Sequence, residues 1–357
     1  MNKDYKILLL GIGSVGGIIA GKLLLCNFNC TLITNNESIT SEIINRGIII
    51  NDTSKKDQLK VRSSNVSTDL NVIDDQFDFI FYMMKATEVA SAIIKSKHLL
   101  KPTGYAVAFQ NGIIDQCFSN IFGNRVIIAS VVFNSIMNEP GVYTLSKTEK
   151  IIIGLPYFNE IKASVLNLKN ILSNVTDCEV TDNIIGISWS KLAINCSINA
   201  ITAISGRTLG EVLKKNFGKE LFFSIYKETI DVATELGIKL EKIKIDPYIL
   251  YSSEKTSFYK KCIQVLLINQ IAKNYSSIYP SMLQDIKKGK KTEIEYLNGY
   301  ISSLGKKLGI STPINDEMTS LIRKIELRYL NPEISHLRIA FELPKLRKSN
   351  YKKIQPT

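Results

Sequence analysis

Three polar side chains recur at four-residue spacing in an otherwise apolar stretch, SWSKLAINCSINAIT, residues 188–202: Lys191, Asn195 and Asn199. On a helix, steps of four residues return to nearly the same side, so these side chains form one stripe. A lysine ammonium can donate a proton, and two carboxamides can bind polar groups without adding charge. The stripe therefore either faces water or lines a binding site.

A candidate carboxylate lies in SMLQDIKKGKKTEIEYLNG, residues 281–299. Thr292 followed three residues later by Glu295 has the spacing of a capping box, so we expect Glu295 to close the start of the next helix. Glu293 either complements the helix dipole in the first turn or faces Lys191 and tunes its ammonium. Spacing alone does not choose between these two roles.

The chain begins with an apolar strand, a glycine turn and a helix from about residue 14, within KILLLGIGSVGG. The glycines satisfy GxGxxG, in which the first permits a tight turn, the second admits a pyrophosphate and the third lets helix pack on strand. The alternative is a chance glycine turn. The predicted cofactor-binding residues of this loop are Gly11, Gly13, Ser14, Val15 and Gly16.

Polar residues also follow the next predicted strands. The second strand ends before Asn35, where an acid would bind the ribose 2′-OH of NAD or an arginine the 2′-phosphate of NADP, and neither is present. The third strand, QFDFIFYMMK, ends at Lys85 and the fourth, YAVAFQNG, near Asn111. Carboxyl ends of parallel strands face the cofactor, so we expect both side chains beside it. Otherwise Lys85 is a solvated strand end and Asn111 a turn residue.

Composition is that of an ordinary globular protein, with 357 residues, 45% of them hydrophobic and 22% charged. The length favours two domains. The net charge of +12 is spread along the chain except in a basic tail, so no nucleic-acid partner is expected. Six scattered cysteines and two histidines offer no metal site and are typical of a cytoplasmic protein with reduced thiols.

The apolar run 7–21 imitates a signal peptide but is shorter than the ~20 residues that span a bilayer, and the glycine turn explains it better. No membrane association is expected. After strands near IIIGLP and CEVTD, the periodicity becomes helical. We expect domains at 1–181 and 182–340, a basic tail at 341–357, and an extra helical segment or lid within 239–279.

Taken together and in this order, several motifs resemble the ketopantoate reductase family (2-dehydropantoate 2-reductase) over about residues 5 to 325. These motifs are GIGSVGG, the lysine after an apolar strand, QNG, WSKLAINCSINAITA, SMLQDIKKGKKTEIEYLNG and GISTPIN. The resemblance implies an α/β Rossmann-type N-terminal domain, an all-helical C-terminal domain and an active site in the cleft between them. It implies reduction of 2-dehydropantoate to pantoate by NADPH, on the way to pantothenate and coenzyme A.

The resemblance also implies site residues. Lys191 matches the family's catalytic lysine, Glu293 the glutamate of its motif, and Lys85 the lysine near the cofactor. The residues that match the substrate and nicotinamide pocket are Asn111, Asn195, Asn199 and Ser281. Hydride delivery to a ketone leaves an oxyanion, which an ammonium can stabilise and protonate. The stripe is thus interpreted as a wall of the pocket.

Three alternatives stay open. Asn35 stands where the family commonly has an arginine for the 2′-phosphate, so NADH is not excluded. The substrate is a small 2-oxo acid, and a related reductase of another branched 2-oxo acid would have the same catalytic residues. A catalytically silent NADP-binding sensor is a further alternative, although it would not need both Lys191 and Glu293. A homodimer is possible.

Overall fold

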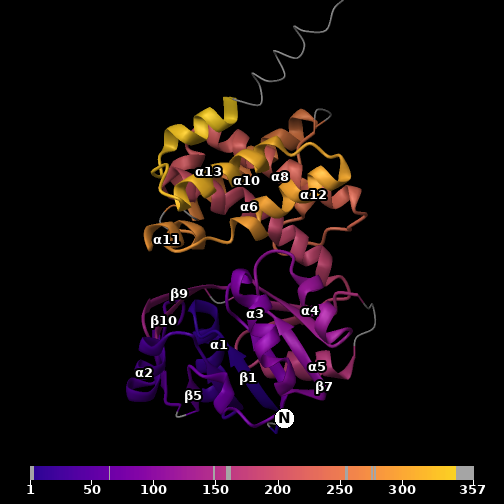
Figure 1. The fold of residues 1–357 in the computed structure, drawn as a ribbon. Helices are drawn as coiled ribbons and strands as arrows, with labels where there is room; N and C mark the ends of the chain where they lie inside the picture. The colour runs from indigo at the N-terminus through magenta and orange to yellow at the C-terminus, as the bar shows by residue number, and fades with distance from the viewer. Residues whose placement is uncertain are drawn as a thin grey trace, which may run out of the picture. The chain divides into compact units, whose positions relative to one another are not determined.

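The computed structural model describes residues 4–63, 65–147, 149–157, 162–253, 256–274, 276 and 279–342 (Figure 1). The chain divides into two units, Met1–Ile184 and Ile185–Thr357. Most of the predicted basic tail, from residue 343 onward, lies outside the described residues, whereas 341 and 342 close a helix at 334–342.

Unit 1 is built on an eight-stranded sheet with the order β12-β11-β8-β7-β6-β1-β2-β5. All neighbours run parallel except β11 and β8, which are antiparallel. The strands are β1 (Lys6–Leu10), β2 (Asn29–Ile33), β5 (Val66–Ser67), β6 (Phe77–Tyr82), β7 (Leu100–Ala108), β8 (Val126–Val131), β11 (Ile151–Gly154) and β12 (Cys178–Val180). The predicted parallel sheet is therefore present.

Helices cover both faces of this sheet. They are α1 (Ser14–Leu25), α2 (Glu37–Arg46), α3 (Ala86–Ser96), α4 (Asp115–Phe122) and α5 (Ala163–Leu172), with 3₁₀ turns η1 (Leu70–Val72) and η2 (Lys97–Leu99). Ile7 and Leu9 of β1 pack in one hydrophobic cluster with α1, α2 and α5, while Leu8 and Leu10 pack in another with α3 and α4. Burial on both faces explains why β1 is continuously apolar rather than alternating.

A second, four-stranded sheet was not anticipated from the sequence. Its order is β4-β3-β10-β9, with β3 (Ile48–Asp52), β4 (Asp57–Val61), β9 (Asn134–Glu139) and β10 (Val142–Lys147). Tyr143 of β10 is fully buried and donates a hydrogen bond of 2.9 Å to the carbonyl of Ile12. A Cβ at Gly17 would lie 2.2 Å from the Tyr143 ring. This sheet therefore supports the glycine loop and the start of α1 from behind.

Unit 2 contains only helices and loops among its described residues, as predicted. Its helices are α6 (Ile184–Ser205), α7 (Leu209–Leu213), α8 (Asn216–Glu235), α9 (Pro247–Leu250), α10 (Phe258–Asn274), α11 (Ser281–Lys287), η3 (Ile294–Tyr296), α12 (Asn298–Leu308) and α13 (Pro313–Glu326). The predicted extra helical segment within 239–279 corresponds to α9 and α10. By length and composition α6 could cross a membrane, but 72% of its most apolar window is buried inside the protein, as in a core helix.

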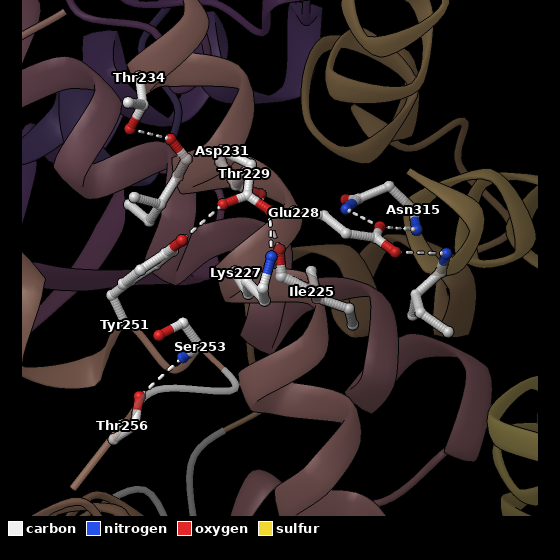
Figure 2. A network of polar contacts seen from close by, with 12 residues as sticks. Ile225, Lys227, Glu228, Thr229, Asp231, Thr234, Tyr251, Ser253, Thr256 and Asn315 are labelled. Atoms are coloured by element: carbon white, nitrogen blue, oxygen red, sulfur yellow. Dashed lines mark hydrogen bonds and ion pairs between the residues drawn. The ribbon is translucent and has the colours of Figure 1, made fainter. Parts of the chain in front are cut away.

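A buried polar network joins four helices of unit 2. Glu228 of α8 accepts hydrogen bonds from the backbone N–H groups of Ile314 and Asn315, both at 2.9 Å, and from the Asn315 side chain at 2.7 Å (Figure 2). The Asn298 amide of α12 donates to Asn315 Oδ1 at 2.9 Å and to the carbonyl of Cys196 in α6 at 3.2 Å. The network therefore fixes α12 and α13 against the helix that carries the polar stripe.

Candidate active site

The glycine loop between β1 and α1 has the backbone that a dinucleotide site needs. Gly11 has φ +93°, and a Cβ there would lie 2.6 Å from the backbone nitrogen of Met84. A Cβ at Gly16 would lie 2.0 Å from the carbonyl oxygen of Gly11, so helix and strand are in close contact there. A Cβ at Gly13 would meet nothing within 4 Å, which leaves open space on the side from which a phosphate would approach.

Gly13 is also the N-cap residue of α1, and it provides no side-chain cap. Ser14 and Val15 form the first turn, whose N–H groups lack partners within the helix. The partial positive charge at this helix start favours an anion. The loop therefore fits the pyrophosphate of a dinucleotide, because it combines open space with backbone donors.

Lys85 and Asn111 lie at equivalent places on neighbouring parallel strands, each three residues beyond the last residue of its strand, β6 or β7. Both side chains are partly exposed. Gln110 joins the two strand ends, since its side-chain amide donates to the carbonyls of Tyr82 at 2.8 Å and Met84 at 3.0 Å. The positioning role of Gln110 was not predicted, because it depends on contacts between segments far apart in the sequence.

Asn35 lies two residues beyond β2 and is exposed. Its side-chain amide donates a hydrogen bond of 3.2 Å to Glu88 in the first turn of α3. Asn36 caps α2 by accepting from the N–H groups of Ser38 and Ile39. Of these two asparagines, Asn36 caps α2, whereas Asn35 donates its side-chain amide to a carboxylate.

In unit 2, the predicted stripe lies on α6. Lys191 and Asn195 are partly exposed, whereas Leu192, Ala193 and Cys196 beside them have no exposed surface. Asn199, one turn further along, is 7% exposed. The partly exposed part of α6 near the stripe therefore includes Lys191, Ile194 and Asn195, whereas Asn199 is buried.

Lys191 interacts electrostatically with Glu293, the residue before η3. Burial lowers the pKa of Lys191 to about 8, and the Glu293 carboxylate acts in the opposite direction by favouring the ammonium. Glu293 is itself partly buried. A lysine with a pKa near neutrality can give up a proton during a reaction and recover it from water at physiological pH.

The predicted capping role of Glu295 is wrong. The helix α12 begins only at Asn298, with no side-chain cap, and Glu295 falls within η3. Both Glu295 oxygens accept from Arg323 of α13, at 2.6 and 2.7 Å, which holds the pKa of this carboxyl below its usual range. A bidentate partner outcompetes a cap. Thr292 instead accepts from the N–H of Ile294 at 3.2 Å.

Ser281 is the exposed first residue of α11, and its place in a substrate pocket stays a prediction. Among the described residues, no group of three or more His, Cys, Asp or Glu side chains could hold a metal ion. All six cysteines are free.

Comparison with known proteins gives two family matches. The family model described as Ketopantoate reductase PanE/ApbA matches residues 7–156, and the model for the C-terminal part of the same family matches residues 183–326. Together they span most of both units.

Two relatives of the same name are similar over most of their length. The 2-dehydropantoate 2-reductase of Pyrococcus horikoshii is 29% identical over 323 residues, covering 90% of this chain and 97% of that protein. The enzyme of the same name from Aquifex aeolicus is 29% identical over 257 residues, covering 70% and 77%.

Solved structures agree in fold. The ketopantoate reductase of Ralstonia eutropha JMP134 has a TM-score of 0.76 at 25% identity, covering 90% of this chain and 99% of that one. A ternary structure of D-mandelate dehydrogenase with NADH and anilino(oxo)acetate has a TM-score of 0.79 at 22% identity, with the same coverage, and shows the fold alone. Both matching models and the full-length relatives lead to one conclusion: the chain belongs to the ketopantoate reductase family, a family of oxidoreductases acting on CH–OH groups.

Proposed function

We propose that this protein reduces 2-dehydropantoate to pantoate, using a reduced nicotinamide dinucleotide as hydride donor. The observation that carries the proposal is Lys191, a lysine on a core helix whose pKa burial lowers to about 8 beside the carboxylate of Glu293. The names of these relatives support the choice of substrate. The six free cysteines are in keeping with a cytoplasmic enzyme.

In this proposal the two units have separate tasks. The glycine loop of unit 1 binds the pyrophosphate with the backbone at Gly13 and the first turn of α1, and Lys85 and Asn111 lie at the ends of neighbouring strands. When bound, the dinucleotide supplies a hydride to the ketone carbon.

Unit 2 supplies the acid. As the carbonyl oxygen gains negative charge, the Lys191 ammonium donates a hydrogen bond and then its proton, which leaves the hydroxyl product and a neutral amine. Glu293 keeps the ammonium charged and oriented before the reaction. Asn195 and Asn199, on the same side of α6, bind the substrate's polar groups without adding a second charge near the lysine. Ser281 is assigned to the same pocket because it matches a pocket position of the ketopantoate reductase family.

The test is the fall in absorbance of NADPH, and in parallel NADH, when the purified protein meets 2-dehydropantoate and then a panel of other branched 2-oxo acids. Rapid turnover with 2-dehydropantoate is expected. If only another oxo acid were turned over, the proposed substrate would be wrong but the proposed mechanism would stand. Dinucleotide binding without turnover of any oxo acid would favour a binding protein without catalysis.

Two substitutions at Lys191 separate charge from proton donation. Lys191→Ala should lower kcat by about 10²- to 10⁴-fold with little change in dinucleotide affinity. Lys191→Arg keeps the positive charge but cannot release a proton, so it should remain far below the parent. The exposed Lys214→Ala is the matched control and should leave turnover unchanged. Near-parental turnover in Lys191→Arg would show that proton donation by this residue is not required.

A further inference from the structure

The carboxyl end of β2 is the place where a dinucleotide-binding sheet meets the adenosine ribose, and an acid there holds the 2′-hydroxyl of NAD. In this protein β2 is followed by Asn35, an uncharged residue. Another element brings a carboxylate to this residue, since the Asn35 side-chain amide donates a hydrogen bond of 3.2 Å to Glu88 of α3. Both side chains are exposed, so a ligand can reach them.

The segment that runs from α1 through β2 to the end of α2 offers little positive charge for a 2′-phosphate. No lysine or arginine occurs between Lys22 and Arg46. Lys22 is buried, 8% exposed, and its ammonium donates to the carbonyl of Val175 at 2.9 Å. Arg46, at the far end of α2, pairs with Glu42 at 3.2 Å and with Glu139 at 3.7 Å. Glu37, in the first turn of α2, adds another negative charge.

We propose that Asn35 and Glu88 together form the ribose-binding pair of this protein and select NADH over NADPH. A carboxylate accepts hydrogen bonds from the two ribose hydroxyls, and the amide of Asn35 holds the carboxylate in place. A 2′-phosphate, which is nearly doubly charged at neutral pH, would be repelled by Glu88 and would find no arginine partner. Two residues that lie 53 positions apart in the sequence therefore determine the choice of cofactor together.

This inference rests on the proposed dinucleotide site and differs from the NADPH that the family resemblance implies. Lys85 is the competing influence, because it lies one turn before Glu88 at the start of α3 and is a cation. If Lys85 controlled the selection, NADPH would bind more tightly and removal of Glu88 would matter little. The two possibilities therefore predict opposite preferences.

The experiment measures dissociation constants of NADH and NADPH for the full chain by the change in their fluorescence, without any oxo acid. The wild-type protein should bind NADH at least about tenfold more tightly than NADPH. Glu88→Gln should tighten NADPH binding several-fold with little effect on NADH, and Asn35→Arg with Glu88→Gln should reverse the preference. Glu42→Gln, which also removes one negative charge from unit 1 but in the middle of α2, is the control and should leave the ratio unchanged.

Tighter binding of NADPH by the wild-type protein, or a ratio unaffected by Glu88→Gln, would overturn the assignment. Failure of both dinucleotides to bind would overturn the site itself. If NADH bound as expected but no oxo acid were reduced, the selection by Asn35 and Glu88 would stand and the proposed reaction would not.

Discussion

Both carboxylate oxygens of Glu295 accept hydrogen bonds from Arg323, at 2.6 and 2.7 Å. This pairing engages the carboxylate with α13 rather than with α6. Glu293, two residues earlier, is the carboxylate that interacts with Lys191. The structure thus separates two glutamates that spacing alone could not assign, one to an ion pair between helices and the other to the lysine.

The activity should depend on pH through Lys191. Burial lowers its pKa to about 8, and an acid catalyst must be protonated before it reacts. We therefore expect kcat/KM for ketone reduction to be level below pH 8 and to fall about tenfold per pH unit above it. The measurement is kcat/KM from pH 6 to 10 at saturating cofactor. A profile that stays level to pH 10 would contradict this assignment of the acid.

Replacing Glu293 should move the break in the pH profile, that is, the pH above which kcat/KM falls. Replacing Glu295 should not. The carboxylate of Glu293 raises the pKa of Lys191, so Glu293→Gln should shift the break below pH 8 and reduce the rate most in alkaline buffer. Glu295→Gln removes only the ion pair with Arg323 and should cost about 1 kcal/mol or less in stability, with the break unmoved. A shift in Glu295→Gln alone would reverse the assignment of the two glutamates.

Glu228 should make folding stability depend on pH. Burial raises its pKa from 4.5 to about 7, although the N–H groups of Ile314 and Asn315 act in the opposite direction. Between these two values the unfolded chain loses the proton and the folded chain keeps it, so this group's contribution to stability falls as pH rises from about 4.5 to 7.

The slope from this group is at most about 1.4 kcal/mol per pH unit. Urea unfolding at pH 5, 6 and 7 gives the free energy of unfolding at each pH. For Glu228→Gln, whose amide cannot ionise, this free energy should fall less steeply with rising pH than for the parent, even if the variant is less stable overall. Parallel slopes in the two proteins would mean that the buried carboxyl does not titrate in this window.

Features specified by nearby residues could be predicted from the sequence. The GxGxxG turn and the helical stripe of Lys191, Asn195 and Asn199 depend only on local spacing, and the structure contains both. The features that were missed depend on distant partners. Glu295 lies 28 residues from Arg323, and the capping spacing gave no sign of that competitor.

The second sheet was missed for the same reason. Its strands are short and come from two separated parts of the chain, with β3 pairing with β10 about 90 residues later. Only the fold brings Tyr143 beneath the glycine loop, where it bonds the carbonyl of Ile12. Sequence reasoning can therefore find the loop that binds a phosphate but not the sheet that supports it.

Two alanine substitutions in the glycine loop should affect different properties, one the dinucleotide affinity and the other the stability. Gly13 has φ −78°, and a Cβ there meets nothing within 4 Å, so Gly13→Ala should fold normally. Its methyl group would occupy the space that a pyrophosphate needs, so dinucleotide affinity should fall by about tenfold or more. At Gly16 a Cβ would lie 2.0 Å from the Gly11 carbonyl oxygen, so Gly16→Ala must displace backbone and should cost about 1–3 kcal/mol in stability.

Thermal unfolding and NADH titration of both variants distinguish the two effects. We expect Gly13→Ala to keep the parental Tm but bind NADH more weakly. Gly16→Ala should have a lower Tm than the parent. Parental affinity in a folded Gly13→Ala protein would mean that the pyrophosphate does not approach at this residue. Because the open space at Gly13 is what makes the loop fit a dinucleotide, that result would also remove the basis for assigning unit 1 to cofactor binding.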